Sequence, residues 1–265
     1  MRNPIHRISP QLWCELRPSI FHGLELIGVF SRQYTPFLIL TRSRSGSNLL
    51  TRTLQSHPHV IAQGEVLRTS NPLPEHVEDD PVESVRRVYI PHPQHVQAIG
   101  FKLFYTHNDD GRHEAWKWLR TQYPALKIIH LTRENRLRVR LSYLIGRETG
   151  KWIKTKPIVG ERQLPTRVYL NLSEWYEQMR SVDAARDAAV SFFEGHDMLD
   201  VTYADLTKNW GETTKRIQTF LGVAPRTLKQ RTIKQNPYRL SELITNYDEV
   251  DAALAGSDYE WMLEK

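Results

Sequence analysis

The segment Arg44, Ser45, Gly46, Ser47 and Asn48 contains the residue types that bind a phosphate or sulfate group. It follows a short apolar run and precedes residues with helical spacing, so it is expected to join a strand to a helix. The first amides of a helix have no partner within it and point toward a bound anion. Gly46 lets the backbone approach the ligand, the serine and asparagine side chains donate hydrogen bonds, and Arg44 adds a forked positive charge. The segment is therefore predicted to cradle an anion.

This segment has two alternative interpretations. The loop of nucleoside triphosphatases reads G-x-x-x-x-G-K-[ST], and here both the first glycine and the Gly-Lys pair are missing. No acidic residue at a strand end is well placed to hold magnesium, which disfavours a metal-dependent kinase. The structural alternative is a strand-to-helix turn in which a serine only caps the helix.

The composition is that of an ordinary globular protein, with 265 residues, 40% hydrophobic and 25% charged. We expect a single domain over residues 1–265, in which residues 1–35 form an irregular or partly helical N-terminal extension. No apolar run approaches the ~20 residues of a membrane span, and residues 1–23 lack the apolar core of a secretory signal. Cys14 is the single cysteine, which excludes an internal disulfide and a Cys-based metal site. A cytoplasmic location is expected.

The net charge of +6 indicates an anionic ligand but does not identify it. The basic residues are dispersed, and neither a zinc-finger pattern nor a basic helix with a zipper is present, so no nucleic-acid partner is expected. The histidines have no metal-ligand spacing, so no metal cofactor is expected.

Short apolar runs alternate with segments of helical spacing along the chain. Strands are predicted at 36–42, 98–105, 127–131 and 198–203, with a further short strand before Glu65. Helices are predicted from residue 48 to before His57, and at 112–123, 134–151, 173–194, 207–221 and 247–254. This alternation predicts an α/β fold with a central parallel β-sheet flanked by helices. Such sheets bind ligands beyond the carboxyl ends of their strands, so the turns at 43–47 and 132–134 are the expected site.

Several segments together resemble the sulfotransferases that use 3′-phosphoadenosine-5′-phosphosulfate (PAPS). The matching segments are TRSRSGSNLL at 41–50, His57-Pro58, Gly64-Glu65, IIHLTRENRLRVRLS at 128–142, YLIGRETGKW at 143–152, VTYADL at 201–206 and FLG at 220–222. The extension at 143–152 resembles the bacterial carbohydrate branch, of the trehalose and lipopolysaccharide type. The resemblance implies a P-loop-like, three-layer fold and PAPS as the co-substrate.

The sequence also departs from the family pattern. Arg44 stands where the cytosolic branch has lysine, and Asn48 replaces a common threonine. The interval of nine from Arg133 to Ser142 is one longer than the most common form. The glycine-rich basic segment that ends the cytosolic branch is absent, and residues 232–237 are the candidate replacement.

The resemblance implies three catalytic residues. Glu65 would be the general base that takes the proton of the acceptor hydroxyl, against the alternative of a solvated loop glutamate. Arg44 would hold the bridging and leaving oxygens, acting through charge because it donates no proton at neutral pH. Lys102 would reach the sulfuryl oxygens, with an edge-strand lysine facing water as the alternative. His57 and His59 are rival bases.

A second group of residues is implied to bind the rest of PAPS, with the loop residues Ser45, Gly46, Ser47 and Asn48 on the 5′-phosphosulfate. Arg133 would grip the 3′-phosphate and Ser142 would add a hydroxyl contact, unless that serine bonds its own helix backbone. Tyr203 would meet the adenine, with core packing as the alternative. Lys234 is a further 3′-phosphate candidate.

The branch suggests that the acceptor is a small molecule, glycan or glycolipid with a hydroxyl group. Residues 67–96 and 152–170 are expected to build its pocket. Two other functions stay open at this point: a protein that binds PAPS or its desulfated product without turnover, and a P-loop kinase.

Overall fold

The computed structural model describes residues 28–67, 80–107, 112–153, 164–230 and 237–264. Its strands are β1 (Phe30–Ser31), β2 (Thr35–Thr41), β3 (Val60–Glu65), β4 (His92–Pro93), β5 (Ala98–Phe104), β6 (Lys127–Thr132) and β7 (Met198–Thr202). Its helices are α2 (Ser47–Leu54), α3 (Pro81–Arg86), α4 (His113–Gln122), α5 (Arg136–Thr149), α6 (Leu172–Phe192), α7 (Tyr203–Lys208), α8 (Trp210–Phe220), α9 (Leu240–Leu243), α10 (Tyr247–Leu254) and the 3₁₀-helix η2 (Glu260–Leu263).

Five strands form the central sheet in the order β3-β5-β2-β6-β7, and every pairing within it is parallel. Strand β2 is central, with β5 on one side and β6 on the other. Since the strands are parallel, their carboxyl ends meet at one edge of the sheet, where the loop after β2 lies.

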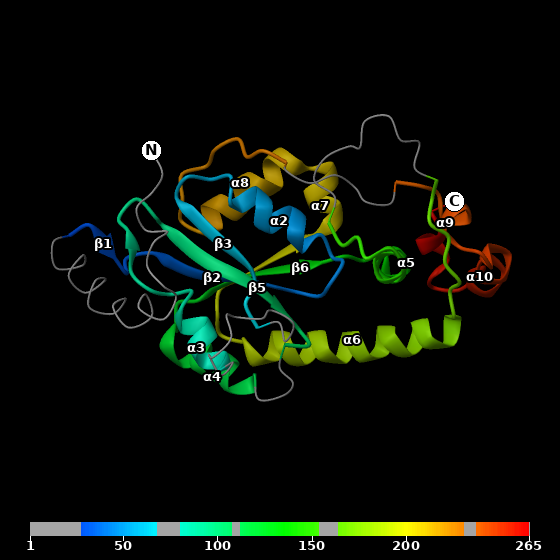
Figure 1. Ribbon diagram of the computed structural model, residues 1–265, viewed down its shortest axis with the longest axis horizontal. Helices are drawn as coiled ribbons and strands as arrows, with labels where there is room; N and C mark the ends of the chain where they lie inside the picture. The colour runs from blue at the N-terminus through cyan, green and yellow to red at the C-terminus, as the bar shows by residue number, and fades with distance from the viewer. Residues whose placement is uncertain (1–27, 68–79, 108–111, 154–163, 231–236, 265) are drawn as a thin grey trace.

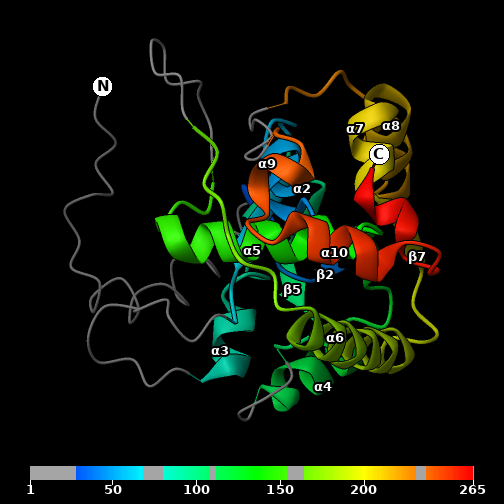
Figure 2. The ribbon, with the colours of Figure 1, turned by 90° about the vertical axis from the view of Figure 1, so that its right-hand side faces the viewer.

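Helices cover both faces of the sheet (Figures 1 and 2). Side chains of a strand alternate between the faces. Leu38 and Leu40 of β2 therefore belong to a core with α3, α4 and α6, whereas Phe37 and Ile39 belong to a core with α2, α7 and α8. The predicted three-layer α/β fold is confirmed.

A third core cluster holds α5 beyond the carboxyl edge of the sheet. It joins α5 and α6 to α9, α10 and η2, and its buried side chains include Leu141, Trp175, Ile244 and Val250. Figure 1 shows α5, α9 and α10 grouped at that end of the molecule. This packing fixes α5, which carries Ser142, next to the loop that follows β2.

The predicted strands and long helices are confirmed within a few residues, with one exception. The single helix predicted over 207–221 is two helices, α7 and α8, separated at Asn209. Thr202 and Asp205 form a capping box that begins a helix at Tyr203. Asn209 has a non-helical backbone (φ −121°, ψ 44°) and ends it. In the described part of the chain, no helix is both long and apolar enough to cross a membrane.

The contact of β2 with β5 generates a prediction about stability. A Cβ added at Gly100 would lie 2.1 Å from the carbonyl oxygen of Phe37, a backbone atom that cannot move without opening the sheet. We expect Gly100→Ala to lower the free energy of unfolding by about 3 kcal/mol, at the upper end of overpacking effects. Gly211 of α8 has open space around its Cβ position, so Gly211→Ala is the control and is expected to stabilise by up to ~1 kcal/mol. Urea unfolding of both variants measures this, and equal stabilities would contradict it.

Candidate functional site

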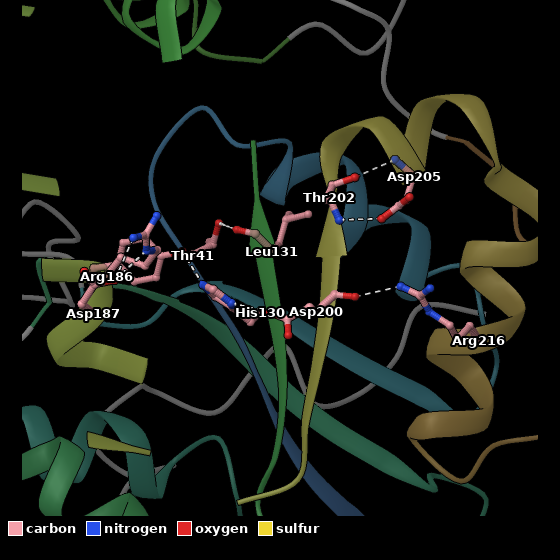
Figure 3. A network of polar contacts seen from close by, with 10 residues as sticks. Thr41, His130, Leu131, Arg186, Asp187, Asp200, Thr202, Asp205 and Arg216 are labelled. Carbon is pink, nitrogen blue, oxygen red and sulfur yellow. Dashed lines mark hydrogen bonds and ion pairs between the residues drawn. The ribbon is translucent and has the colours of Figure 1, made fainter. Parts of the chain in front are cut away.

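The loop between β2 and α2 is held in shape by buried hydroxyl groups. Thr41 donates a hydrogen bond of 2.6 Å to the carbonyl of Leu131 in β6, a contact visible in Figure 3. The Thr41 and Ser45 hydroxyls lie 2.7 Å apart, and Ser45 donates to the carbonyl of Arg42 at 2.9 Å. The Ser45 side chain, predicted to contact the ligand, thus shapes the loop itself.

Two residues of this loop adopt left-handed backbone conformations. Gly46 has φ +98°, and a Cβ there would lie 2.5 Å from Cδ2 of Tyr203. Arg44 has φ 66°, which is uncommon for a residue with a side chain. Gly46 is also the N-cap of α2 and offers no side-chain cap to the helix. The first amides of α2, around Ser47 and Asn48, therefore receive no hydrogen bond from the N-cap residue. An anion site at a helix start requires such uncapped amides.

Arg133 and Tyr203 lie beside this loop. The guanidinium carbon of Arg133 lies 4.3 Å from the centre of the Tyr203 ring, a cation–π contact. Nη1 of Arg133 donates to the carbonyl of Arg44 at 3.3 Å. Tyr203 is therefore positioned against both Gly46 and Arg133. The turns after β2 and β6 meet at the carboxyl edge as predicted, and the start of α7, directly after β7, joins them.

Arg44 extends toward α5. Its Nε and Nη2 donate to Ser142 Oγ at 2.9 and 2.8 Å, and its Nη1 donates to the carbonyl of Trp152 at 2.7 Å. Burial, and then the neighbouring charge of Arg133, lower the pKa of Arg44 from its ordinary value. Burial also lowers the pKa of Arg133, against the opposing effect of Tyr203. Two partly desolvated guanidinium groups side by side favour an anionic ligand.

A second polar group lies on β3 and β5. Lys102 Nζ lies 2.9 Å from Oε1 of Glu65 and donates to Asn48 Oδ1 at 2.8 Å. Only 3% of the Lys102 side chain is exposed, against 22% for Glu65. The alternative of an edge-strand lysine facing water is wrong, because β5 lies between β3 and β2. Asn48 belongs to α2, so Lys102 ties Glu65 directly to the loop that follows β2.

The two histidines considered as rival bases lie elsewhere. His57 and His59 precede β3, whereas Glu65 ends it, so they lie at the opposite end of that strand. The His57 ring contacts the carbonyl of Ala224 at 3.0 Å, and the His59 ring contacts the carbonyl of His95 at 2.6 Å. Both rings hold the backbone in place.

His130 is also engaged within the fold. Its ring nitrogens contact the Tyr105 hydroxyl at 2.9 Å and the Asp200 carboxylate at 2.7 Å. The contact with Asp200 joins β6 to β7 on the face of the sheet that α6 covers (Figure 3).

Lys234 and Trp152 are the remaining residues for which the sequence predicted a place at the site. Lys234 lies outside the described residues. Trp152, in a segment predicted to line the acceptor pocket, contacts Arg44 through its carbonyl and lies with its ring 5.6 Å from that guanidinium. A Cβ at Gly146 would lie 2.8 Å from the Trp152 ring, so the ring packs closely against α5 at this glycine. Among the described residues, no group of three or more His, Cys, Asp or Glu side chains is arranged to hold a metal ion.

The capping box that positions Tyr203 generates a prediction about pH. Hydrogen bonds from Thr202, chiefly from its backbone amide, hold the pKa of Asp205 below its usual value of 3.8. A depressed carboxyl pKa stabilises the fold above the unfolded value, and this stabilisation is lost as pH falls through the folded pKa. We expect Asp205→Asn to be less stable than the parent chain near pH 7, and we expect this difference to narrow near about pH 3, below the unfolded pKa. Urea unfolding at both pH values measures the difference, and a difference that did not change with pH would contradict it.

Comparison with known proteins identifies the family of this chain. A sequence model of the Sulfotransferase family matches residues 36–226. Nodulation protein H of Rhizobium tropici is 26% identical over 239 residues, covering 86% of this chain and 93% of that protein. Nodulation protein H of Rhizobium meliloti (strain 1021) is 25% identical over 240 residues, covering 86% and 95%. A sulfotransferase structure from Alicyclobacillus acidocaldarius is 15% identical, covers 88% of this chain and 96% of its own, and gives a TM-score of 0.48. Because the family match covers more than half of its length, the chain belongs to the sulfotransferase family.

Proposed function

We propose that this sulfotransferase takes the sulfuryl group from PAPS and transfers it to a hydroxyl of a carbohydrate or glycolipid. The contact of Lys102 with both Glu65 and Asn48 carries the proposal. This contact connects the Glu65 carboxylate, which is suited to accept a proton, to the start of α2, which is suited to bind the phosphosulfate. Transfer requires both groups, whereas binding of the nucleotide alone requires only the helix start.

The donor would occupy two neighbouring anion sites. The 5′-phosphosulfate would lie against Arg44 and the amides of Gly46, Ser47 and Asn48 at the start of α2. The 3′-phosphate would lie against Arg133 and Ser142. Because Arg44 already hydrogen-bonds to Ser142, the two sites adjoin, which suits two phosphate groups carried on one ribose. An adenine contact for Tyr203 belongs to the same proposal.

The reaction requires one bond to sulfur to form as another breaks. The acceptor oxygen bonds to sulfur, its proton passes to the Glu65 carboxylate, and the bond from sulfur to the bridging phosphate oxygen breaks. The leaving phosphate gains negative charge, which Arg44 and the α2 amides are positioned to stabilise. Lys102, almost fully buried, would place its charge near the sulfuryl oxygens while orienting Glu65. The chain therefore supplies positioning, charge and one base, as transfer of such a group demands.

Aromatic side chains next to Arg44 support a carbohydrate acceptor. The Trp152 ring lies 5.9 Å from the ring of Tyr143 and 5.6 Å from the Arg44 guanidinium. Trp152 is 41% exposed, so part of an apolar ring faces solvent at the proposed reaction site. Such a surface can pack against the apolar face of a sugar ring.

Substitution of Glu65 tests its proposed role as the general base. We expect Glu65→Gln to lower the rate of sulfuryl transfer from PAPS by a factor of about 10² to 10⁴, because the amide cannot accept the proton. Its affinity for 3′,5′-ADP, the desulfated donor, should stay close to that of the parent chain, because Glu65 lies on β3 and not in the anion loop. Initial rates with radiolabelled PAPS and calorimetric titration of 3′,5′-ADP measure the two quantities.

Glu212→Gln, in the first turn of α8, is the matched control and should retain the parent rate. Undiminished transfer by Glu65→Gln would remove Glu65 from the mechanism. A parent chain that binds 3′,5′-ADP but transfers nothing to any hydroxyl would favour a nucleotide-binding protein without turnover.

A further inference from the structure

A carboxylate of the chain itself is bound at the start of α5. The Arg138 guanidinium donates to Oε2 of Glu264 from Nε at 2.9 Å and from Nη2 at 2.7 Å. The side-chain amide of Asn135, the N-cap residue of α5, donates to Oε1 of Glu264 at 2.9 Å. A guanidinium fork and a neighbouring amide suit a phosphate group as well as a carboxylate.

Arg138 lies on the side of α5 that carries Ser142. It precedes Ser142 by four positions, and residues at that spacing are neighbours one turn apart on one face of a helix. Ser142 Oγ accepts from Arg44 at 2.9 and 2.8 Å, and Arg133 donates to the Arg44 carbonyl at 3.3 Å. Arg138 is thus a neighbour of one residue proposed to bind the 3′-phosphate, and Arg44 links that residue to the other.

Glu264 and Arg138 also lie close enough to Arg133 to act on its charge. Burial lowers the pKa of Arg133 most, and Tyr203 opposes that effect. The charge of Arg138 then lowers the pKa further, and the charge of Glu264 raises it. Because the interaction between charges weakens with distance, the Glu264 carboxylate lies near both arginines.

The two partners of this ion pair differ in burial. Only 9% of the Arg138 side chain is exposed, against 45% for Glu264. Removing the partner of a buried charge is strongly destabilising, so Arg138 requires an anion at all times. Glu264 is close to half exposed and can return to water at a smaller cost. An anionic ligand can therefore replace Glu264, provided that it compensates Arg138.

The backbone of Glu264 also favours such an exchange. Its φ of 52° and ψ of 43° are left-handed, which is uncommon for a residue with a side chain. The residue follows η2, and its amide donates to the Trp261 carbonyl at 3.3 Å. The contacts of the carboxylate hold this conformation in place, and release of the side chain would relieve it.

We propose that Arg138 is a further ligand of the donor's 3′-phosphate and that Glu264 occupies its guanidinium until the donor binds. A phosphate group carries more negative charge than a carboxylate and offers three acceptor oxygens, so it can displace Glu264 from the fork. The inference rests on the proposed use of PAPS. It makes Glu264 a competitor of the donor and of its desulfated product, and so a determinant of how fast that product leaves.

Removing the charge of Glu264 tests the competition. In calorimetric titrations, Glu264→Gln should bind 3′,5′-ADP about tenfold more tightly than the parent chain does, because the phosphate no longer displaces a charged partner. ADP and 5′-AMP, which lack the 3′-phosphate, should bind equally to both proteins. Equal affinity for 3′,5′-ADP, or a gain shared by all three nucleotides, would overturn the inference.

Glu194→Gln is the matched control for that substitution. It removes the same charge from an exposed residue that lies between α6 and β7, at the amino edge of the sheet. Its affinity for 3′,5′-ADP should equal that of the parent chain. A gain equal to that of Glu264→Gln would show a general effect of net charge and would also overturn the inference.

A conservative substitution tests Arg138 directly. Arg138→Lys keeps the charge and removes the fork, so it should weaken binding of 3′,5′-ADP by about tenfold and leave the affinity for 5′-AMP unchanged. Adding Glu264→Gln to this variant should restore less affinity than it adds to the parent chain, because the two residues act through one contact. Equal losses for both nucleotides would show that Arg138 serves only the fold.

Hydrogen exchange tests the displacement in the parent chain, without any substitution. The Met262 carbonyl accepts from Asn135 at 2.9 Å, so residues 260–264 are held to α5 next to the carboxylate contact. Saturation with 3′,5′-ADP should speed amide exchange in residues 260–264, whereas saturation with 5′-AMP should not. Unchanged or slower exchange with 3′,5′-ADP would overturn the inference alone. A parent chain that does not bind 3′,5′-ADP would instead refute the proposed function.

Discussion

The hydrogen bond from Thr41 to the Leu131 carbonyl is the contact on which the site depends. It joins the ends of β2 and β6, and the Thr41 hydroxyl also lies 2.7 Å from Ser45, which fixes the turn into α2. The anion loop, the start of α2 and the approach to Arg133 are thus set by one buried hydroxyl. Because a buried hydroxyl without a partner is costly, this connection resists rearrangement and preorganises the loop.

Concentrated positive charge follows from that arrangement. Arg42 and Arg44 both belong to the loop after β2, and Arg133 lies beside Arg44 over the Tyr203 ring. Burial lowers the pKa of all three arginines, so the ligand-free fold keeps these charges at a cost in stability. Bound anions would offset that cost, so anion binding should raise the stability of the folded protein.

The sequence predicted what depends on local pattern. The loop at 43–47 was recognisable because its residue types lie between an apolar strand and a helix. The pairing of Lys102 with Glu65 was not, because it depends on which strands are neighbours and on a register shift between Gln63 and Glu65. The split of the helix predicted over 207–221 was missed because the capping box at Thr202 was not recognised. The contact of Arg44 with Trp152 joins residues far apart in sequence, and neither residue type predicts it. The single domain, the cytoplasmic location and the role of Lys234 remain predictions.

The proposed function depends on a donor site in which two phosphate-binding positions adjoin. Calorimetric titration of the chain with 3′,5′-ADP, ADP and 5′-AMP tests it most directly. Since Arg133 and Ser142 should each contact the 3′-phosphate, 3′,5′-ADP should bind at least about tenfold more tightly than the other two nucleotides. Equal affinity for all three would contradict the two-phosphate site and, with it, the proposed use of PAPS.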